Sequence, residues 1–246
     1  MAFGIQDERG FNQVFRPVGT TPERARRRYE WFAARVRELS ASRVLEIGCG
    51  LGDAAHAVAI ATDAQVLGID LSPNFVAKAQ RQFAAPTLSY RVLDIWSPDF
   101  DALGPFDLVM GNGILHHLRP QLVDVLARLR ALTSPNGGLA FIEPNLGHPA
   151  CLFLFGTSVG RRWGKLEPDE MAFYAGELRD SVRSAGWQQT SVQTTDLLLP
   201  GLPTPLTKPL LTLERLVEGG AAAKILGQSH FLTARASQPP GPPAPD

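Results

Sequence analysis

Short apolar runs alternate with amphipathic stretches along most of this chain. The apolar runs are rich in Val, Leu and Ile and are nearly continuous, a pattern typical of strands buried on both faces. They lie at residues 43–47, 65–70, 88–94, 106–111 and 139–144. Helical spacing occurs between them, over about 52–62, 73–84 and 119–133. Strands that alternate with helices in this way predict right-handed βαβ units and an α/β fold with a doubly wound, mostly parallel sheet and helices on both faces.

A further helix is expected before the first strand. Thr21-Pro22-Glu23 combines a capping hydroxyl, a proline suited to the first turn and an early acid, and the helical stripe that follows ends near Ser40. The basic residues of this helix lie mostly off its apolar stripe, so we expect a solvated face rather than a binding patch. They are Arg24, Arg26, Arg27 and Arg28.

The regular alternation of strand and helix patterns ends after Pro144. The sequence predicts a long connection with an apolar centre over 145–167, a helix from about Pro168 to Ala185 and a strand near 189–196. Four prolines in 197–227 exclude a long helix before about Leu210. A last strand is expected over 229–236.

These patterns suggest three parts. Residues 1–40 form an N-terminal arm and helix on the substrate side, and residues 41–237 form the core, with insertions at 145–167 and 197–227. The tail, 238–246, is rich in proline and is expected to be disordered.

Composition narrows the class of protein. With 44% hydrophobic residues among 246, the chain can build a sizeable core. The 24 basic residues equal the 24 acidic ones, so no overall field favours nucleic acid or anionic membranes. No secretory signal is visible at the start, and the longest apolar runs are too short to span a bilayer. We expect a soluble, cytoplasmic protein that is a monomer or a homodimer and binds no nucleic acid.

The most informative segment is Val44 to Asp53, VLEIGCGLGD. A hydrophobic strand runs directly into three glycines at alternate positions, and a helix follows. Such glycines let the backbone turn tightly and approach a ligand, while the helix N-terminus presents free N–H groups. The segment therefore predicts a nucleotide-like ligand at the carboxyl end of the first strand.

Acidic residues end three of the predicted strands. Glu46 stands two residues before the first glycine, and Asp70 follows Gly48 by 22 residues at the end of the second strand. A carboxylate at that position can accept both ribose hydroxyls of an adenosine. Asp94 ends the third strand, where it can accept a hydrogen bond from an adenine amino group.

VLEIGCGLG, VLGIDLS, RVLDIW, FDLVMGNGILHHL and SPNGGLAFIEPN together resemble the successive motifs of class I S-adenosylmethionine-dependent methyltransferases. The resemblance covers about residues 40–145. It implies S-adenosyl-L-methionine as the cofactor, S-adenosyl-L-homocysteine as the product and a seven-stranded Rossmann-like sheet whose last strand is antiparallel. The helix-strand-strand order after residue 168 fits that sheet.

The resemblance also implies roles for particular residues. The Gly48–Gly52 loop would hold the methionine portion, Asp70 the ribose hydroxyls, and Asp94 and Ile95 the adenine, with Gly111 and Asn112 beside the methionine end. The residues expected to bind the cofactor are Glu46, Gly48, Cys49, Gly50, Gly52, Asp70, Leu71, Asp94, Ile95, Gly111 and Asn112.

Methyl transfer from a sulfonium is an in-line displacement, which depends chiefly on positioning and desolvation. A general base is needed only where the acceptor is protonated, as in an alcohol or phenol. The candidates at strand ends are His116, His117 and Glu143. Adjacent histidines on a helix point in different directions and no cysteine is nearby, so we expect no metal site.

Substrate contacts are expected from Phe11, Phe15, His148 and Tyr174, and from the apolar segments 145–167 and 197–227, which can form a lid. Such a lid suits a small hydrophobic or aromatic acceptor, methylated on oxygen, nitrogen or carbon. The alternatives are a non-catalytic methyltransferase-like binding module, an enzyme that methylates a macromolecule and, on weaker grounds, an NAD(P)-dependent oxidoreductase. Asp53 stands where the dinucleotide fingerprint of the last class requires a glycine.

Overall fold

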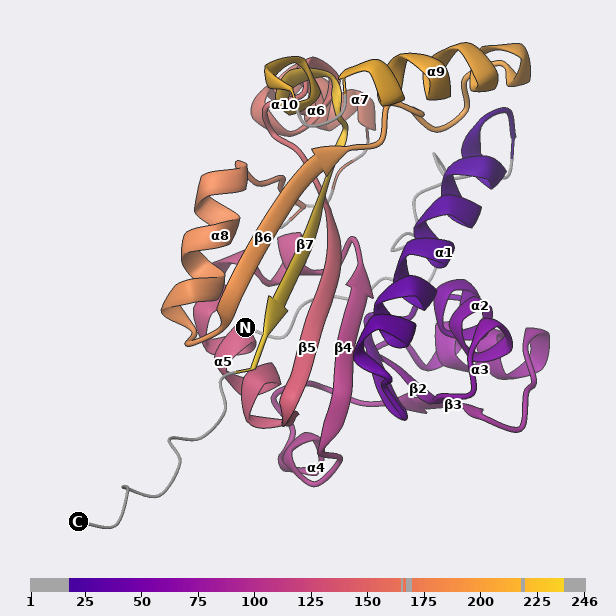
Figure 1. Cartoon of the computed structure of the whole chain (residues 1–246), viewed down its shortest axis with the longest axis vertical. Helices are drawn as coiled ribbons and strands as arrows, with labels where there is room; N and C mark the ends of the chain where they lie inside the picture. Colours follow the sequence, from indigo (N-terminus) through magenta and orange to yellow (C-terminus); the bar gives the residue numbers. More distant parts are fainter. Residues whose placement is uncertain (1–17, 165, 167–169, 218–219, 237–246) are drawn as a thin grey trace.

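The computed structural model describes residues 18–164, 166, 170–217 and 220–236. Seven strands form one sheet in the order β3-β2-β1-β4-β5-β7-β6, in which only β7 runs against its neighbours (Figure 1). The strands are β1 (Arg43–Ile47), β2 (Gln65–Asp70), β3 (Leu88–Val92), β4 (Phe106–Asn112), β5 (Thr133–Pro144), β6 (Gln188–Thr195) and β7 (Ser229–Arg235). The mostly parallel, seven-stranded sheet expected from the sequence is confirmed.

Helices cover both faces of the sheet (Figure 1). One face carries α1 (Thr21–Leu39), α2 (Asp53–Ala61) and α3 (Pro73–Gln82). The other carries α4 (Pro98–Asp101), a 3-10 helix η2 (Leu115–Gln121), α5 (Leu122–Ala131) and α8 (Ala175–Ser184). Successive residues of one strand point to opposite faces of the sheet: Val44 packs with the first group of helices and Leu45 with the second. This alternation explains why the central strands, such as β1 and β4, are largely apolar on both faces, whereas β6 at the edge of the sheet is polar.

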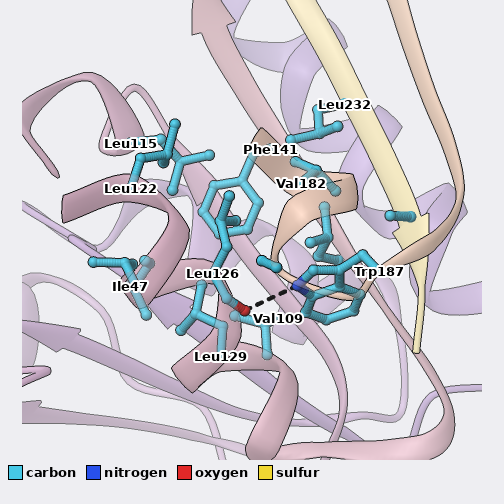
Figure 2. Packing of buried hydrophobic residues seen from close by; sticks show 14 of the residues in the cluster. Ile47, Val109, Leu115, Leu122, Leu126, Leu129, Phe141, Val182, Trp187 and Leu232 are labelled. Carbon is cyan, nitrogen blue, oxygen red and sulfur yellow. Dashed lines mark hydrogen bonds between the residues drawn. The ribbon is translucent and has the colours of Figure 1, made fainter. Parts of the chain in front are cut away.

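The core under α5 and α8 joins the two halves of the chain. Figure 2 shows Trp187, which precedes β6, packed against α5 with its indole nitrogen 2.9 Å from the Leu126 carbonyl. Trp187 is buried, so this hydrogen bond satisfies the one polar group of a large apolar side chain. Phe141 of β5 and Leu232 of β7 lie in the same cluster.

Four further helices lie beyond the carboxyl ends of the parallel strands (Figure 1). They are α6 (Pro149–Gly156), α7 (Ser158–Gly164), α9 (Thr207–Val217) and α10 (Ala221–Leu226), with a short 3-10 turn, η3 (Thr204–Leu206), before α9. We call these four helices the cap. The 145–167 segment, predicted from the sequence as a long connection with an apolar centre, contains the helices α6 and α7. Pro209 also does not delay α9 to Leu210, because it stands in the first turn, where its missing N–H costs nothing.

The segment before α8 differs from expectation as well. A helix from about Pro168 was predicted, but residues 170–174 are not helical and α8 begins at Ala175; residues 167–169 lie outside the described part. Phe173 instead forms a parallel bridge with Asn145 beyond the end of β5. A strand-like contact of this kind depends on a distant segment, which local helical spacing does not reveal.

The start of α1 forms hydrogen bonds with the segment 197–227. The Thr21 hydroxyl, expected to cap the helix, instead accepts a hydrogen bond from Gly201 N at 2.9 Å, and the Thr20 hydroxyl donates to the Leu199 carbonyl. The predicted capping role is therefore wrong. The reason is tertiary, since a partner almost two hundred residues away takes up the hydroxyl.

His230 links β7 to two neighbouring segments. Its Nδ1 accepts from the Thr194 hydroxyl at 2.9 Å and its Nε2 donates to the Phe173 carbonyl at 3.0 Å. Burial lowers the pKa of His230 from 6.5 to about 4. The folded protein therefore keeps this imidazole neutral at a pH where the unfolded chain protonates it.

We predict that His230→Gln makes stability less sensitive to acid. In the native protein, this group causes a loss of stability as the pH falls from 6.5 to about 4, because only the unfolded chain takes up the proton in that window. The loss amounts to roughly 3 kcal/mol at full protonation of the unfolded state. Urea unfolding at several pH values measures the slope. An identical slope in the variant would contradict the assignment.

Candidate active site

The glycine loop between β1 and α2 needs its glycines. Gly48, Gly50 and Gly52 have φ angles of +63°, +52° and +87°, a left-handed region that other residues rarely adopt. A β-carbon at Gly52 would also lie 2.5 Å from the hydroxyl oxygen of Tyr90. That hydroxyl donates to the Gly52 carbonyl at 2.8 Å, so Tyr90 of β3 supports the loop from beneath. Nothing in the sequence around Tyr90 pointed to this role.

Three carboxylates surround the loop. Glu46 of β1 is 2% exposed; its carboxylate accepts a hydrogen bond from Ala55 N, but its Oε2 has no partner among the described residues. Burial, with smaller contributions from the charges of Asp53 and Asp70, raises the pKa of Glu46 well above its usual value. No basic side chain forms an ion pair with any of the three acids in the described part of the chain. The loop is therefore an environment that favours a positively charged group.

Asp70 lies where the sequence placed it, at the carboxyl end of β2. Its Oδ2 accepts from Gly50 N at 2.8 Å and its Oδ1 from Ser72 N at 2.9 Å. Burial raises the pKa of this carboxyl group. A carboxylate has about four acceptor positions, so capacity remains for a ligand hydroxyl. Asp70 thus connects the glycine loop to the start of α3.

The residues expected around an adenine lie at the rim beside Asp70. Leu93 N donates to the Asp70 carbonyl, which brings the segment after β3 next to the end of β2. Asp94 is exposed and its Oδ1 accepts from Trp96 N at 2.9 Å, while Leu71 is exposed and Ile95 half-buried. These side chains form an open edge beside the acids. Cys49, within the loop, is buried, and burial raises the pKa of its thiol.

The end of β4 forms the other side of the site. Gly111 is buried, and a β-carbon there would lie 2.7 Å from side-chain atoms of Ile114 and Phe141. Asn112 is half-buried, and its Oδ1 accepts from Nη1 of Arg28 at 3.0 Å. Helix α1 therefore reaches the carboxyl end of β4.

Glu143 of β5 organises the segment after β4. Its Oε1 accepts from Ile114 N at 3.0 Å and Leu115 N at 2.8 Å, and its Oε2 lies 2.8 Å from Nδ1 of His116. Glu143 is buried, and within the described residues it accepts one further bond, a longer one from His116 N at 3.3 Å. A carboxylate can only accept, so Nδ1 of His116 carries the proton and Nε2 is the acceptor nitrogen. Nε2 has no hydrogen-bond partner in the described part of the chain.

His117 lies beside this pair, with its ring 4.2 Å from that of His116 between centroids. The structure thus brings together the three residues that the sequence proposed for catalysis, and only His116 is held by the buried carboxylate. No group of acids, histidines and cysteines that would hold a metal ion occurs among the described residues.

The residues expected to contact substrate are less closely grouped. His148 caps α6, where its Nδ1 accepts from Ala150 N at 3.2 Å, and burial lowers the pKa of its imidazole. Tyr174 is half exposed immediately before α8. Phe11 and Phe15 lie outside the described residues.

The basic residues of α1 correct one expectation. Arg24 and Arg28, predicted to form part of a solvated face, are 5% and 9% exposed. Arg27 forms an ion pair with the buried Glu214 of α9, and only Arg26 is exposed and paired along its own helix. The prediction is wrong because the segment leading from β6 to α9 covers this side of α1, a contact between residues far apart in the sequence.

Helix α1 also brings Tyr29 to the acidic loop. Tyr29 is half-buried, and its pKa is raised by burial and by the nearby charges of Asp53 and Glu46. Its position could be anticipated only as part of the apolar stripe of the helix. None of the described helices is both long and apolar enough to cross a bilayer.

Comparison with known proteins identifies the family. A family model described as a methyltransferase domain matches residues 45–139. The chain is 30% identical over 173 residues to a ubiquinone biosynthesis O-methyltransferase of Xanthomonas campestris pv. campestris, covering 69% of this chain and 70% of that protein. It is 34% identical over 119 residues to a trans-aconitate 2-methyltransferase of Methylobacterium nodulans, covering 48% of this chain and only 44% of that relative.

The fold agrees with these relatives. The magnesium protoporphyrin IX methyltransferase of Synechocystis PCC 6803, solved with bound S-adenosylhomocysteine, superposes with a TM-score of 0.56 at 18% identity, over 87% of this chain and 84% of that one. The glycine loop, the acids at the strand ends, the sheet order and the sequence relatives agree. The chain belongs to the class I S-adenosylmethionine-dependent methyltransferases.

Proposed function

We propose that S-adenosylmethionine binds along the carboxyl ends of β1, β2 and β4. The observation that supports this is the buried carboxylate of Glu46, whose Oε2 has no partner in the described part of the chain, within a loop whose acids lack basic partners there. A ligand with a sulfonium and an ammonium group complements such a site electrostatically. When bound, the cofactor supplies a methyl group on a positively charged sulfur. The residues present fit that group.

The contacts follow from the order of the strand ends. Asp70 would accept from the ribose hydroxyls, and the rim residues Leu71, Asp94 and Ile95 would contact the adenine. The glycine loop and the Gly111–Asn112 turn would hold the methionine portion. Tyr29 of α1 lies close enough to the acids of the loop for the charges of Asp53 and Glu46 to raise its pKa, so it is a further candidate to contact the charged end of the ligand.

We propose further that the chain methylates a hydroxyl group of a small, hydrophobic or aromatic acceptor. The observation that carries this proposal is the 2.8 Å contact between Nδ1 of His116 and the buried Glu143, which orients an imidazole whose Nε2 is a free acceptor among the described residues. A phenol or alcohol must lose its proton as the new bond forms, and an oriented neutral imidazole can accept it. Transfer to a neutral amine nitrogen needs no such base in the bond-forming step.

The reaction balances with these residues. The bound cofactor would supply its methyl group to the acceptor oxygen, and the sulfur would leave as a neutral thioether with the electron pair of the broken carbon–sulfur bond. His116 takes the hydroxyl proton at Nε2, and Glu143 stabilises the resulting imidazolium through Nδ1. Glu143 is a positioning residue, because its oxygens are already occupied by the η2 backbone and His116.

The cap supports an apolar acceptor. Its helices carry several large exposed apolar side chains beyond the carboxyl ends of the strands; these are Leu152, Phe153, Val159, Trp163, Leu213, Leu216, Ile225 and Leu226. The ubiquinone biosynthesis relative acts, by its name, on oxygen. Because the chain belongs to the methyltransferases, it is not an NAD(P)-dependent oxidoreductase. Measurements of cofactor affinity and of methyl transfer to small acceptors distinguish the enzyme from a binding module without turnover and from an enzyme with a macromolecular acceptor.

We predict that Asp70→Ala weakens binding of S-adenosylhomocysteine more than tenfold, because hydrogen bonds from ligand hydroxyls to a charged, buried acceptor contribute about 1.5–3 kcal/mol. Calorimetric titration measures the affinity, with Asp63→Ala as the control for loss of one exposed negative charge. Asp70 also holds Gly50 and Ser72, so adenosine and 2′-deoxyadenosine should be compared as well. If the variant still discriminates between the two nucleosides as the native protein does, Asp70 does not contact the ribose.

We predict that His116→Gln lowers kcat by about 10²- to 10⁴-fold, the usual contribution of a general base, while the affinity for S-adenosylhomocysteine is unchanged. Transfer of a labelled methyl group to the best acceptor from a panel of phenols and catechols provides the assay. Glu143→Gln should lower kcat in the same direction, because it removes the charge that stabilises the imidazolium.

His117→Gln is the matched variant for this test. If kcat falls in His117→Gln and not in His116→Gln, then His117 is the general base. Full turnover in both variants would contradict base catalysis by either histidine and favour an acceptor that needs none.

A further inference from the structure

Two buried arginines on α1 share one carboxylate. Arg24, Arg28 and Asp196, which follows β6, are 5%, 9% and 3% exposed. Nε and Nη2 of Arg28 donate to Oδ2 of Asp196 at 3.1 and 2.7 Å. Nε of Arg24 forms an ion pair with the same oxygen at 2.9 Å, yet it is buried and no described residue accepts a hydrogen bond from it. The cluster therefore contains one more positive charge than negative charges.

The surrounding residues do not remove this excess. Gln228 and Ser229, which contact the two guanidinium groups, are neutral, and so is Asn112. Another buried acid on the packed elements, Glu214, pairs with Arg27 and accepts from Leu197 N. Within the described residues, three arginines of α1 thus face two carboxylates. A buried charge without a counterion is costly, so a ligand that supplies a negative charge would be bound favourably.

The geometry directs Arg28 toward the active site. Its Nε and Nη2 are fixed on Asp196, and its Nη1 reaches Asn112 at the end of β4, 3.0 Å away. Asp196 itself has a φ angle of +75°, a conformation unusual for a residue other than glycine, and the buried contacts hold it there. Nη1 has a second proton for which no partner exists in the described part of the chain. Asp196 thus fixes one edge of the guanidinium and leaves the Nη1 edge available at the site.

We propose that Arg28, together with Asn112, binds a carboxylate of the bound ligand, and that Asp196 positions Arg28 for this contact. The inference rests on the proposed function, since the site is the same. A planar guanidinium matches a carboxylate in shape and charge. The cofactor's amino-acid end is the source that the charges favour: the acids of the glycine loop suit its cationic groups, and Arg28, which contacts Asn112 at the end of β4, suits its anionic group. A carboxylate on the acceptor has the same chemistry and is the second source.

The test compares ligands with and without the carboxylate. S-adenosylhomocysteine carries it, and 5′-methylthioadenosine has the same nucleoside and a thioether but lacks it. In Arg28→Met we expect S-adenosylhomocysteine to bind at least tenfold more weakly and 5′-methylthioadenosine to bind unchanged. Arg24 remains to pair with Asp196 in this variant, so no lone buried charge is created. Thermal unfolding checks the fold.

Arg26→Met is the matched control. It removes the same charge from the same helix, but Arg26 is exposed and pairs only with Glu23 and Glu30. It should bind both nucleosides like the native protein. Asp196→Asn should weaken S-adenosylhomocysteine selectively as well, because Arg28 loses its fixed orientation; a merely structural role would affect both ligands alike.

A separate titration tests whether the carboxylate belongs to the acceptor. With S-adenosylhomocysteine bound, 3,4-dihydroxybenzoate is titrated against catechol, which lacks the carboxylate. If Arg28→Met leaves S-adenosylhomocysteine unaffected but abolishes a native preference for the dihydroxybenzoate, the subsite serves the acceptor. Equal weakening of both nucleosides, or no change in any ligand, would overturn the proposal. A native protein that binds neither nucleoside would overturn the cofactor assignment instead.

Discussion

The parallel direction of β1, β2, β3, β4 and β5 is the constraint on which the site depends. Because these strands share one direction, the turns that follow them gather at one edge of the sheet, and residues far apart in the sequence become neighbours there. The glycine loop, Asp70, Asn112 and Glu143 all occupy such turns or strand ends. The central strands pack through apolar side chains, whereas the polar residues of the site lie at the carboxyl edge of the sheet.

The charges at this edge are divided between two sides. Carboxylates surround the glycine loop without basic partners, whereas buried arginines approach the end of β4 from α1. Neither side is neutralised within the described part of the chain. A ligand with cationic and anionic groups at one end would compensate both, which is why the cofactor and the proposed carboxylate subsite belong to one electrostatic arrangement.

Helix α1 is held by the second half of the chain. Thr20 and Thr21 bind the segment 199–201, Arg27 binds Glu214, and Arg24 and Arg28 bind Asp196. The helix that carries Tyr29 is thereby connected to the segment that continues into the cap. These contacts fix the position of α1 relative to that segment.

The sequence by itself determined the order of the strands along the chain, the sheet type and the glycine loop, because hydrophobic period, glycine spacing and helix signals are local properties. Asp70 and Glu143 were found for the same reason, as acids at strand ends. Only the tertiary structure decided that Arg24 and Arg28 are buried, that Thr21 binds Gly201 rather than capping its helix, and that Glu143 holds His116. The helices α6 and α7, the early start of α9 and the late start of α8 also escaped the local patterns. Each of these features depends on a partner distant in the sequence or on packing around the sheet edge, and the local pattern of residues does not contain that information.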